Sequence, residues 1–209
     1  NSTVYAISNI GSDLYVGGYF TTAGGLTANH IARWNGTQWF SLGNGVNKKV
    51  NAIREIGTNL YVGGDFDSAV TIRTNSLAKW DGIHWSNLGI GEGARIVKAL
   101  LVYGTTLYVG GDLNTYLGSG DLTDHVLKWD GIHWSDVGSG MDDWVKALVV
   151  IGNDVYVGGY FTSAGSTRVN RIAKWDGTKW SALGSGMNGS VSALALSGGY
   201  LYAGGRFTT

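Results

Sequence analysis

The fold is decided by two stretches, Leu14-Tyr15-Val16-Gly17-Gly18-Tyr19-Phe20-Thr21 and Ile31-Ala32-Arg33-Trp34-Asn35-Gly36-Thr37-Gln38-Trp39, which recur along the chain. The first recurs at 60–66, 107–113, 155–162 and 201–208, and the second at 77–85, 126–134 and 172–180, without a fifth copy. Each unit opens with Val-x-Ala-Ile/Leu, and the units are 46 to 48 residues apart. They begin at Val4, Val50, Val97, Val145 and Val191.

Short apolar runs that are β-branched, aromatic and interrupted by glycine indicate strands, and they exclude helix-pair repeats of similar length. We therefore predict an all-β fold, a β-propeller of four-stranded antiparallel blades. Strand A of each blade covers 4–10, 50–56, 97–103, 145–151 and 191–196, and its hydrophobicity predicts burial on both faces. Strand B is Leu-Tyr-Val-Gly-Gly, strand C is Ile-Ala-Lys/Arg-Trp, and strand D is Trp-Ser-x-Leu-Gly. The Asn-Gly or Asp-Gly between C and D is a strong hairpin signal.

Four complete blades and half of a fifth are predicted, all within one propeller domain that covers residues 1–209. The blades span 1–49, 50–96, 97–144 and 145–190, and the half-blade, 191–209, holds only strands A and B. An unpaired strand edge invites a partner. We therefore expect a longer native chain, or further copies or a partner that supply the missing strands.

The composition excludes several classes of protein. Lys plus Arg and Asp plus Glu number 15 each among 209 residues, so the chain lacks the field of a nucleic-acid binder. It contains no cysteine, and therefore no disulfide, Cys-ligated zinc or thiol nucleophile. No run of about 18 apolar residues is present, so membrane insertion is not expected.

The repeats resemble the kelch repeat of propellers such as the central domain of galactose oxidase. They are most similar to kelch-like repeats of large secreted or surface-anchored bacterial proteins and of a fungal cell-polarity landmark protein. The segments 156–162, 170–177 and 180–184 carry this resemblance. It implies a propeller and an extracellular or cell-surface location, with which three Asn-x-Ser/Thr sequons at Asn1, Asn35 and Asn188 are compatible. The oxidase's copper chemistry, which depends on a Tyr–Cys cross-link, is excluded because there is no cysteine.

No catalytic constellation is visible. His84 and His133 stand where other blades have Gln38 and Lys179, so we interpret them as solvent-facing turn residues. His30 and His125 are interchangeable with Ser76 and Arg171 in the same way. No cofactor is expected. The one metal alternative is Ca²⁺ bound by carboxylates in or beside loops, namely Asp65 with Asp67, Asp121 with Asp124, and Asp142 with Asp143.

The repeated tryptophans allow two interpretations. Trp34, Trp39 and their counterparts in each blade suit packing between blades, or alternatively one sugar pocket per blade. Trp144 differs from them, because Thr3, Lys49, Ile96 and Ser190 take its place in the other units. We therefore choose Trp144 as the candidate surface anchor.

Strand alternation places the variable B–C and D–A loops on one face and the short A–B and C–D turns on the other. When residues vary between repeats on one face of a repeat protein, that face is expected to bind a partner. The residues that follow Gly-Gly vary as well, and they are predicted to line the same face. They are Tyr19, Asp65, Asp112, Tyr160 and Arg206.

The first functional hypothesis is a non-catalytic binding or structural module of an extracellular or cell-surface protein that contacts a protein or glycan partner through this face. The alternative is a lectin-like, carbohydrate-binding propeller. A third hypothesis is an enzyme with a site built from loops, for which Asp65, Asp112 and Asp142 are the candidates.

Overall fold

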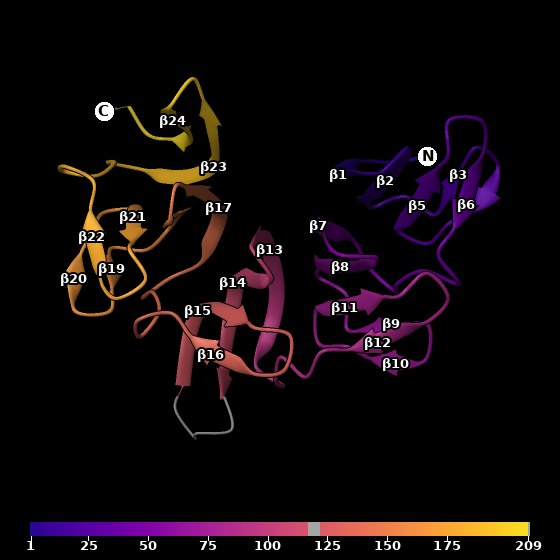
Figure 1. Ribbon diagram of the computed structural model, residues 1–209, viewed down its shortest axis with the longest axis horizontal. Coiled ribbons are helices and arrows are strands. Elements are labelled where there is room, and N and C mark those ends of the chain that lie inside the picture. Colours follow the sequence, from indigo (N-terminus) through magenta and orange to yellow (C-terminus); the bar gives the residue numbers. More distant parts are fainter. Residues whose placement is uncertain (117–121, 209) are drawn as a thin grey trace. The chain divides into compact units, whose positions relative to one another are not determined.

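The computed structural model describes residues 1–116 and 122–208 (Figure 1). Four antiparallel sheets of four strands follow one another, and strands A, B, C and D are neighbours in that order in each sheet. The sheet of blade 1 consists of β1 (Val4–Ile10), β2 (Asp13–Gly18), β5 (Ile31–Trp34) and β6 (Trp39–Ser41). That of blade 2 consists of β7 (Val50–Ile56), β8 (Asn59–Gly64), β11 (Leu77–Trp80) and β12 (Trp85–Asn87).

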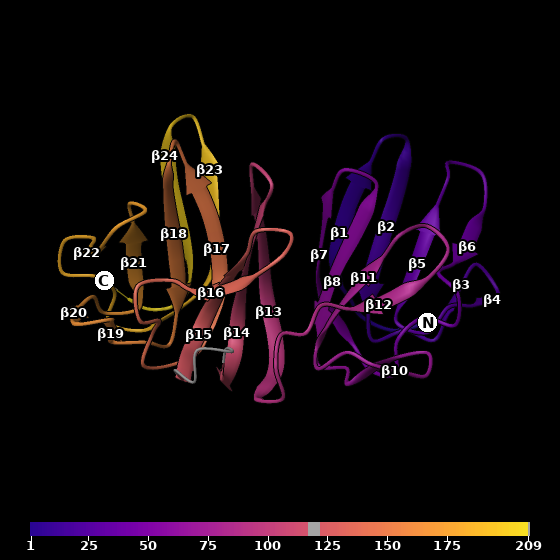
Figure 2. The ribbon, with the colours of Figure 1, turned by 60° about the horizontal axis from the view of Figure 1, so that its bottom comes forward.

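Blades 3 and 4 repeat this order, and two further strands follow them. Blade 3 holds β13 (Ala94–Tyr103), β14 (Thr106–Tyr116), β15 (Leu122–Trp129) and β16 (Trp134–Asp136). Blade 4 holds β17 (Val145–Ile151), β18 (Asp154–Gly159), β21 (Ile172–Trp175) and β22 (Trp180–Ala182). The half-blade is a hairpin of β23 (Ser190–Ser197) and β24 (Tyr200–Arg206), which lies beside β17 and β18 (Figure 2).

The predicted strand A is confirmed to the residue in blades 1, 2 and 4, but its expected burial on both faces is wrong for β1 and β23. Only Ala6 is buried in β1, while Val4 and Ile7 are exposed. The equivalent residues of β7, Val50 and Ile53, are fully buried against blade 1. Among the described residues of its own unit, each of these strands packs against one neighbouring blade, β1 against β7 and β23 against β17 and β18.

The segments expected as B–C loops each contain short strands, which the prediction did not include. Three of them form hairpins of two-residue strands, and in blade 3 β14 and β15 continue the ladder through Asn114↔Asp124 to Tyr116↔Leu122. Threonine, tyrosine and leucine favour the extended conformation there. The three small hairpins are β3 (Thr22–Ala23) with β4 (Leu26–Thr27), β9 (Ser68–Ala69) with β10 (Ile72–Arg73), and β19 (Ser163–Ala164) with β20 (Thr167–Arg168).

The chain divides into two compact units, residues 1–97 and 98–209. In the first unit, Trp85 is buried in the cluster between blades 1 and 2, and its Nε1 donates to the Leu42 carbonyl at 2.9 Å. In the second, Nε1 of Trp180 donates to the Val137 carbonyl at 3.0 Å. Packing between blades is thereby confirmed for these two tryptophans.

A β-bulge recurs at the second residue of strand A, where two residues face one on strand B. The register runs Val4↔Gly18 and then Ala6↔Gly17, so that Tyr5 is the extra residue. The same shift makes Asn51, Lys146 and Ser192 the extra residues of β7, β17 and β23. A bulge re-aims the side chain of the extra residue and is common beside functional sites.

Candidate recognition surface

Four positions of each blade meet where strand A begins and strand B ends, and we call each group a loop-end cluster. They are the residue before strand A, the bulge residue, the residue after Gly-Gly, and the residue before strand C. Backbone hydrogen bonds hold these four positions together. In blade 1 the Tyr19 amide donates to the Thr3 carbonyl at 2.8 Å, and the Gly18 amide donates to the His30 carbonyl at 3.0 Å. The side chains differ between blades, whereas the backbone contacts recur in blades 2 and 4.

The cluster of blade 1 is aromatic. The exposed ring of Tyr19 stacks on His30, with centroids 5.7 Å apart and planes at 23°. Burial lowers the pKa of His30, although a hydrogen bond with the Gly18 backbone opposes the shift, so the ring is neutral near pH 7. The Nδ1 atom of His30 is buried and has no hydrogen-bond partner among the described residues. The sequence comparison, which treated His30 and His125 as interchangeable positions, missed that both are buried.

Two predicted site residues, Asp65 and Asp112, make contacts within the protein and do not face solvent freely. The Asp65 carboxylate lies 3.0 Å from Lys49 Nζ and accepts a hydrogen bond from Asn51 at 2.7 Å. Asp112 is buried within β14. A carboxylate that is buried or already ion-paired within the protein has little exposed surface with which to contact a binding partner.

Blade 4 brings together Trp144 and Tyr160, two predicted site residues. Their rings meet edge to face, with centroids 6.3 Å apart. Lys146 Nζ lies 4.7 Å from the centroid of the Tyr160 ring and donates to Ser192 Oγ at 3.1 Å. The guanidinium of Arg171 donates to the Tyr160 and Phe161 carbonyls. Tyr160 is exposed and Trp144 half-buried, so the group offers aromatic surface and two cations together.

The cations of this cluster, Lys146 and Arg171, lie beside aromatic rings and carbonyl groups. Among the described residues, no carboxylate forms an ion pair with Lys146 or Arg171. Arg206, which follows the Gly-Gly of the half-blade, is also exposed. Sequence comparison had singled out Trp144 because the other units have no aromatic residue there, and Tyr160 because the residue after Gly-Gly varies between blades. Lys146 was missed, and only its alignment with Tyr5, Asn51 and Ser192 at the bulge could have found it.

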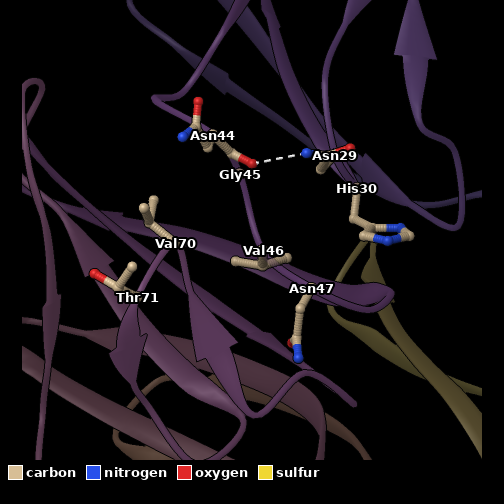
Figure 3. Close-up of a pocket in the computed structure, with 8 residues that line it drawn as sticks. All are labelled: Asn29, His30, Asn44, Gly45, Val46, Asn47, Val70 and Thr71. Carbon is tan, nitrogen blue, oxygen red and sulfur yellow. Dashed lines mark hydrogen bonds between the residues drawn. The ribbon is translucent and has the colours of Figure 1, made fainter.

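A pocket of about 500 Å³ lies beside the blade 1 cluster, within the first unit (Figure 3). Asn44 and Asn47 line it from the D–A loop, and Val70 and Thr71 from the β9–β10 hairpin. Asn29 Nδ2 donates to the Asn44 carbonyl at 3.0 Å and holds one wall. The ring of His30 points away from Val70 and Asn44 (Figure 3).

Val70 is strained, with φ at 56° in the left-handed region. The equivalent hairpin residues of blades 1 and 4 are Gly24 and Gly165, with φ at 56° and 53°. A β-branched residue in this region is an outlier, and the left-handed conformation costs about 1–2 kcal/mol. Such strain is concentrated at functional sites. At this position of the pocket wall, blade 2 therefore differs from blades 1 and 4, which have glycine there.

We expect Val70→Gly to raise the free energy of unfolding by roughly 0.5–1 kcal/mol, because relief of strain exceeds the added entropy of glycine in the unfolded chain. Urea unfolding followed by tryptophan fluorescence measures the change. The reciprocal variant Gly165→Val should destabilise, since a Cβ there would lie 2.7 Å from the Gly138 carbonyl oxygen. A loss of stability in Val70→Gly would show that the valine is not strained.

Two of the carboxylates considered for Ca²⁺, Asp67 and Asp142, form contacts within the protein. Asp67 is paired with Lys48 Nζ at 2.9 Å, and hydrogen bonds from Lys48 and Asn47 lower its pKa. Asp142 accepts the Thr162 and Ser163 amides at 2.7 and 2.9 Å, as Asn47 accepts the equivalent amides in blade 2. Asp121 and the side chain of Asp124 lie outside the described residues. Within the described ranges, no three His, Asp or Glu residues gather as metal ligands.

Three carboxyl groups whose pKa is lowered lie in the C–D turns. Hydrogen bonds from the Thr178 hydroxyl and from the Lys179 and Thr178 amides lower the pKa of Asp176 to about 2. The amides of two turn residues likewise lower the pKa of Asp81 and of Asp130. These groups cap the C–D hairpins. The side chains of His84 and His133 are 78% exposed in the same turns, which confirms them as solvent-facing.

Comparison with known proteins supports the fold. No protein-family model and no curated protein matches this chain. The computationally designed protein Ika8 is similar in structure, with a TM-score of 0.51 and 15% identity over 98% of this chain and 69% of that one. The extracellular domain of a hybrid two-component system from B. thetaiotaomicron is also similar, with a TM-score of 0.55 and 13% identity over 99% of this chain.

This chain spans about a third (32%) of that second protein's chain. At sequence identities of 15% and 13%, the similarity shows a shared fold and does not show a shared function. The fold is all-β, with the repeated four-stranded antiparallel blades of a propeller. In the described part of the chain, no helix has the length and apolar character needed to span a bilayer.

Proposed function

We propose that this chain is a non-catalytic binding module of an extracellular or cell-surface protein, and that it contacts its partner through the loop-end clusters. The observation that carries this proposal is the group of Trp144, Lys146 and Tyr160, which the repeat scaffold does not require. Tryptophan and tyrosine are enriched at recognition surfaces and among the residues that contribute most to binding. Propellers host unrelated activities, so the function depends on the residues of the site and not on the fold.

Two further observations support the proposal. The carboxylates considered for catalysis are ion-paired in Asp65, buried in Asp112 and hydrogen-bonded to amides in Asp142. The kelch-like character of the repeats and the similarity to an extracellular domain favour a surface location. A binding module whose blades differ at equivalent positions can present different contacts on one scaffold.

Photo-cross-linking tests which face binds. A photoreactive phenylalanine analogue at position 160 is expected to capture a partner from a cell-envelope preparation of the source. The same analogue at position 132 is the control, because Ile132 is 74% exposed in the C–D turn of blade 3. Capture at 132 and not at 160 would contradict the proposal.

Carbohydrate binding is the second candidate, and the half-buried Trp144 set against Tyr160 favours it. Lys146 and Arg171 form no ion pair with a carboxylate in the described part of the chain, and they fit an acidic sugar, since aromatic rings cover the sugar face and cations pair with its carboxylate. Titration with oligogalacturonate and with a neutral oligosaccharide of equal length separates the cases. Lys146→Ser, the residue found at 192, should weaken only the acidic ligand. Equal binding of both sugars would contradict the assignment.

A further inference from the structure

The pocket of the first unit lies between three segments whose residues differ from blade to blade. Residues 29–30 line it from the end of the B–C segment of blade 1, residues 44–47 from the D–A loop, and residues 70–71 from the β9–β10 hairpin. Its volume is about 500 Å³, whereas a cavity of about 150 Å³ holds one benzene ring. The pocket is therefore larger than a single side chain requires, and it is large enough for a mono- or disaccharide.

Two polar side chains of the pocket are available to a ligand. The amides of Asn29 and Asn47 are already used, since Asn29 donates to the Asn44 carbonyl and Asn47 accepts the backbone amides of residues 67 and 68. The side-chain amide of Asn44 and the hydroxyl of Thr71, by contrast, form no hydrogen bond with any residue in the described ranges. Both side chains are exposed.

Two valines give the pocket an apolar wall. Val46 is 2% exposed, whereas Val70 is 44% exposed and lies between Asn44 and Thr71 along one side of the pocket (Figure 3). Val70 keeps its isopropyl group in the strained left-handed conformation, where blades 1 and 4 have glycine. Strain of this kind persists at ligand sites, where the side chain contributes to binding.

The pocket is uncharged. No acid, lysine or arginine is among the described residues that line it. Asp67, which Asn47 contacts, is already paired with Lys48. A charged ligand would lose its hydration here without gaining an opposite charge, so the lining favours a neutral ligand that carries both polar and apolar groups.

We propose that this pocket binds an N-acetylated sugar of the N-acetylhexosamine class. Its acetamido group carries an N–H donor, a carbonyl acceptor and a methyl group. The Asn44 amide offers the complementary acceptor and donor, and Thr71 pairs with a neighbouring hydroxyl of the sugar. The methyl group packs on Val46 and Val70, where burial of apolar surface favours binding. The pocket shares no residue with the blade 4 cluster, so it binds its ligand whether or not that cluster binds a partner.

The second unit does not repeat this site. At the positions of Asn44, Val70 and Thr71 it has Ser139, Gly165 and Ser166. These residues offer neither the amide nor the isopropyl group. We therefore expect a single site in the first unit, and not one sugar pocket in every blade.

NMR titration of the ¹⁵N-labelled 209-residue chain with N,N′-diacetylchitobiose and with cellobiose tests the proposal. The two disaccharides have the same linkage, and they differ only in the acetamido groups. Diacetylchitobiose should bind with a Kd of about 1 mM or lower and cellobiose at least about ten-fold more weakly, as expected for a small ligand that loses its apolar contact. The amide signals that shift should be those of residues 44–47 and 70–71.

Two variants locate the site. Val70→Gly should weaken the binding of diacetylchitobiose about ten-fold through the lost apolar contact, although it is expected to stabilise the fold. Thr71→Val keeps the shape of the side chain and removes the hydroxyl, so it should weaken binding about five-fold. Thr58→Val is the matched control, because Thr58 is an exposed threonine in the A–B turn of blade 2. It should bind diacetylchitobiose as the parent chain does.

Circular dichroism shows whether the variants fold, and Asn44→Ser, with the residue of position 139, replaces either one that does not. Absence of shifts at about 10 mM diacetylchitobiose, ten times the expected Kd, would overturn the proposal. Equal affinities for the two disaccharides would overturn the acetamido assignment, and undiminished binding by Val70→Gly would overturn the location. Capture of a partner at position 160 is independent of these results, so failure here is distinguishable from failure of the proposed function.

Discussion

Gly158→Ala is expected to lower the free energy of unfolding by about 3 kcal/mol, at the upper end of overpacking effects. The added Cβ would lie 2.5 Å from Val191 Cγ1, and Val191 is fully buried between blade 4 and the half-blade. A β-branched side chain has few rotamers with which to move aside. Urea unfolding followed by tryptophan fluorescence measures the loss.

Gly204→Ala is the matched control, because the same repeat position has open space around it in the half-blade. At low protein concentration its stability should stay within about 0.5 kcal/mol of the parent chain, as for most surface substitutions. Equal losses in the two variants would show that strand propensity, and not contact between blades, decides the effect.

Trp180→Ala should cost about 3–5 kcal/mol, as truncation of a buried tryptophan does. The indole is 6% exposed, and its removal leaves the Val137 carbonyl without the Nε1 donor 3.0 Å away. Trp180→Phe keeps most of the apolar contact and loses the hydrogen bond, so it should cost about 1–3 kcal/mol as an unsatisfied group does. Urea midpoints of the two variants separate packing from hydrogen bonding.

Trp39→Ala supplies the control for this prediction. Trp39 has the same place in blade 1, but it packs on a cluster of its own blade and is only half-buried. Its truncation should cost less than half as much as that of Trp180. A larger loss at Trp39 would contradict the view that these tryptophans stabilise the protein mainly through the neighbouring blade.

The blades were predictable because their local signals agree. Gly-Gly, Asn/Asp-Gly and the alternation of apolar residues each indicate strands of the same length and order, and β1, β7 and β17 match the predicted bounds. The hairpins inside the B–C segments were missed because strands of two residues, such as β9 and β10, carry no period. Exposure of β1 was missed because the sequence pattern of a strand does not show whether a neighbouring blade covers it.

The candidate site was predictable only in part. Variation at equivalent positions singled out Trp144 and Tyr160, which the structure brings together. The same argument selected Asp65, which is instead held by Lys49. Variation alone does not distinguish a residue that faces solvent from one that satisfies a neighbour, because pairing depends on geometry across two strands.

The residues before strand C share a left-handed backbone conformation but have different side chains and contacts. His30, Ser76, His125 and Arg171 all have φ between 64° and 71°. Two of these side chains are buried imidazoles, while Arg171 donates to carbonyls beside the blade 4 cluster. The shared backbone and the differing side chains agree with a scaffold that keeps its conformation while its contacts change.

The central claim is that shared residues build the scaffold and unshared residues bind. Replacing the blade 4 pair with the residues found in other blades, Trp144→Thr from position 3 and Tyr160→Asp from position 65, tests it most directly. The double variant should keep the urea midpoint of the parent chain and lose at least about ten-fold in binding of the labelled chain to the cell-envelope preparation, as loss of interface anchors does. A lowered midpoint with undiminished binding would contradict the account.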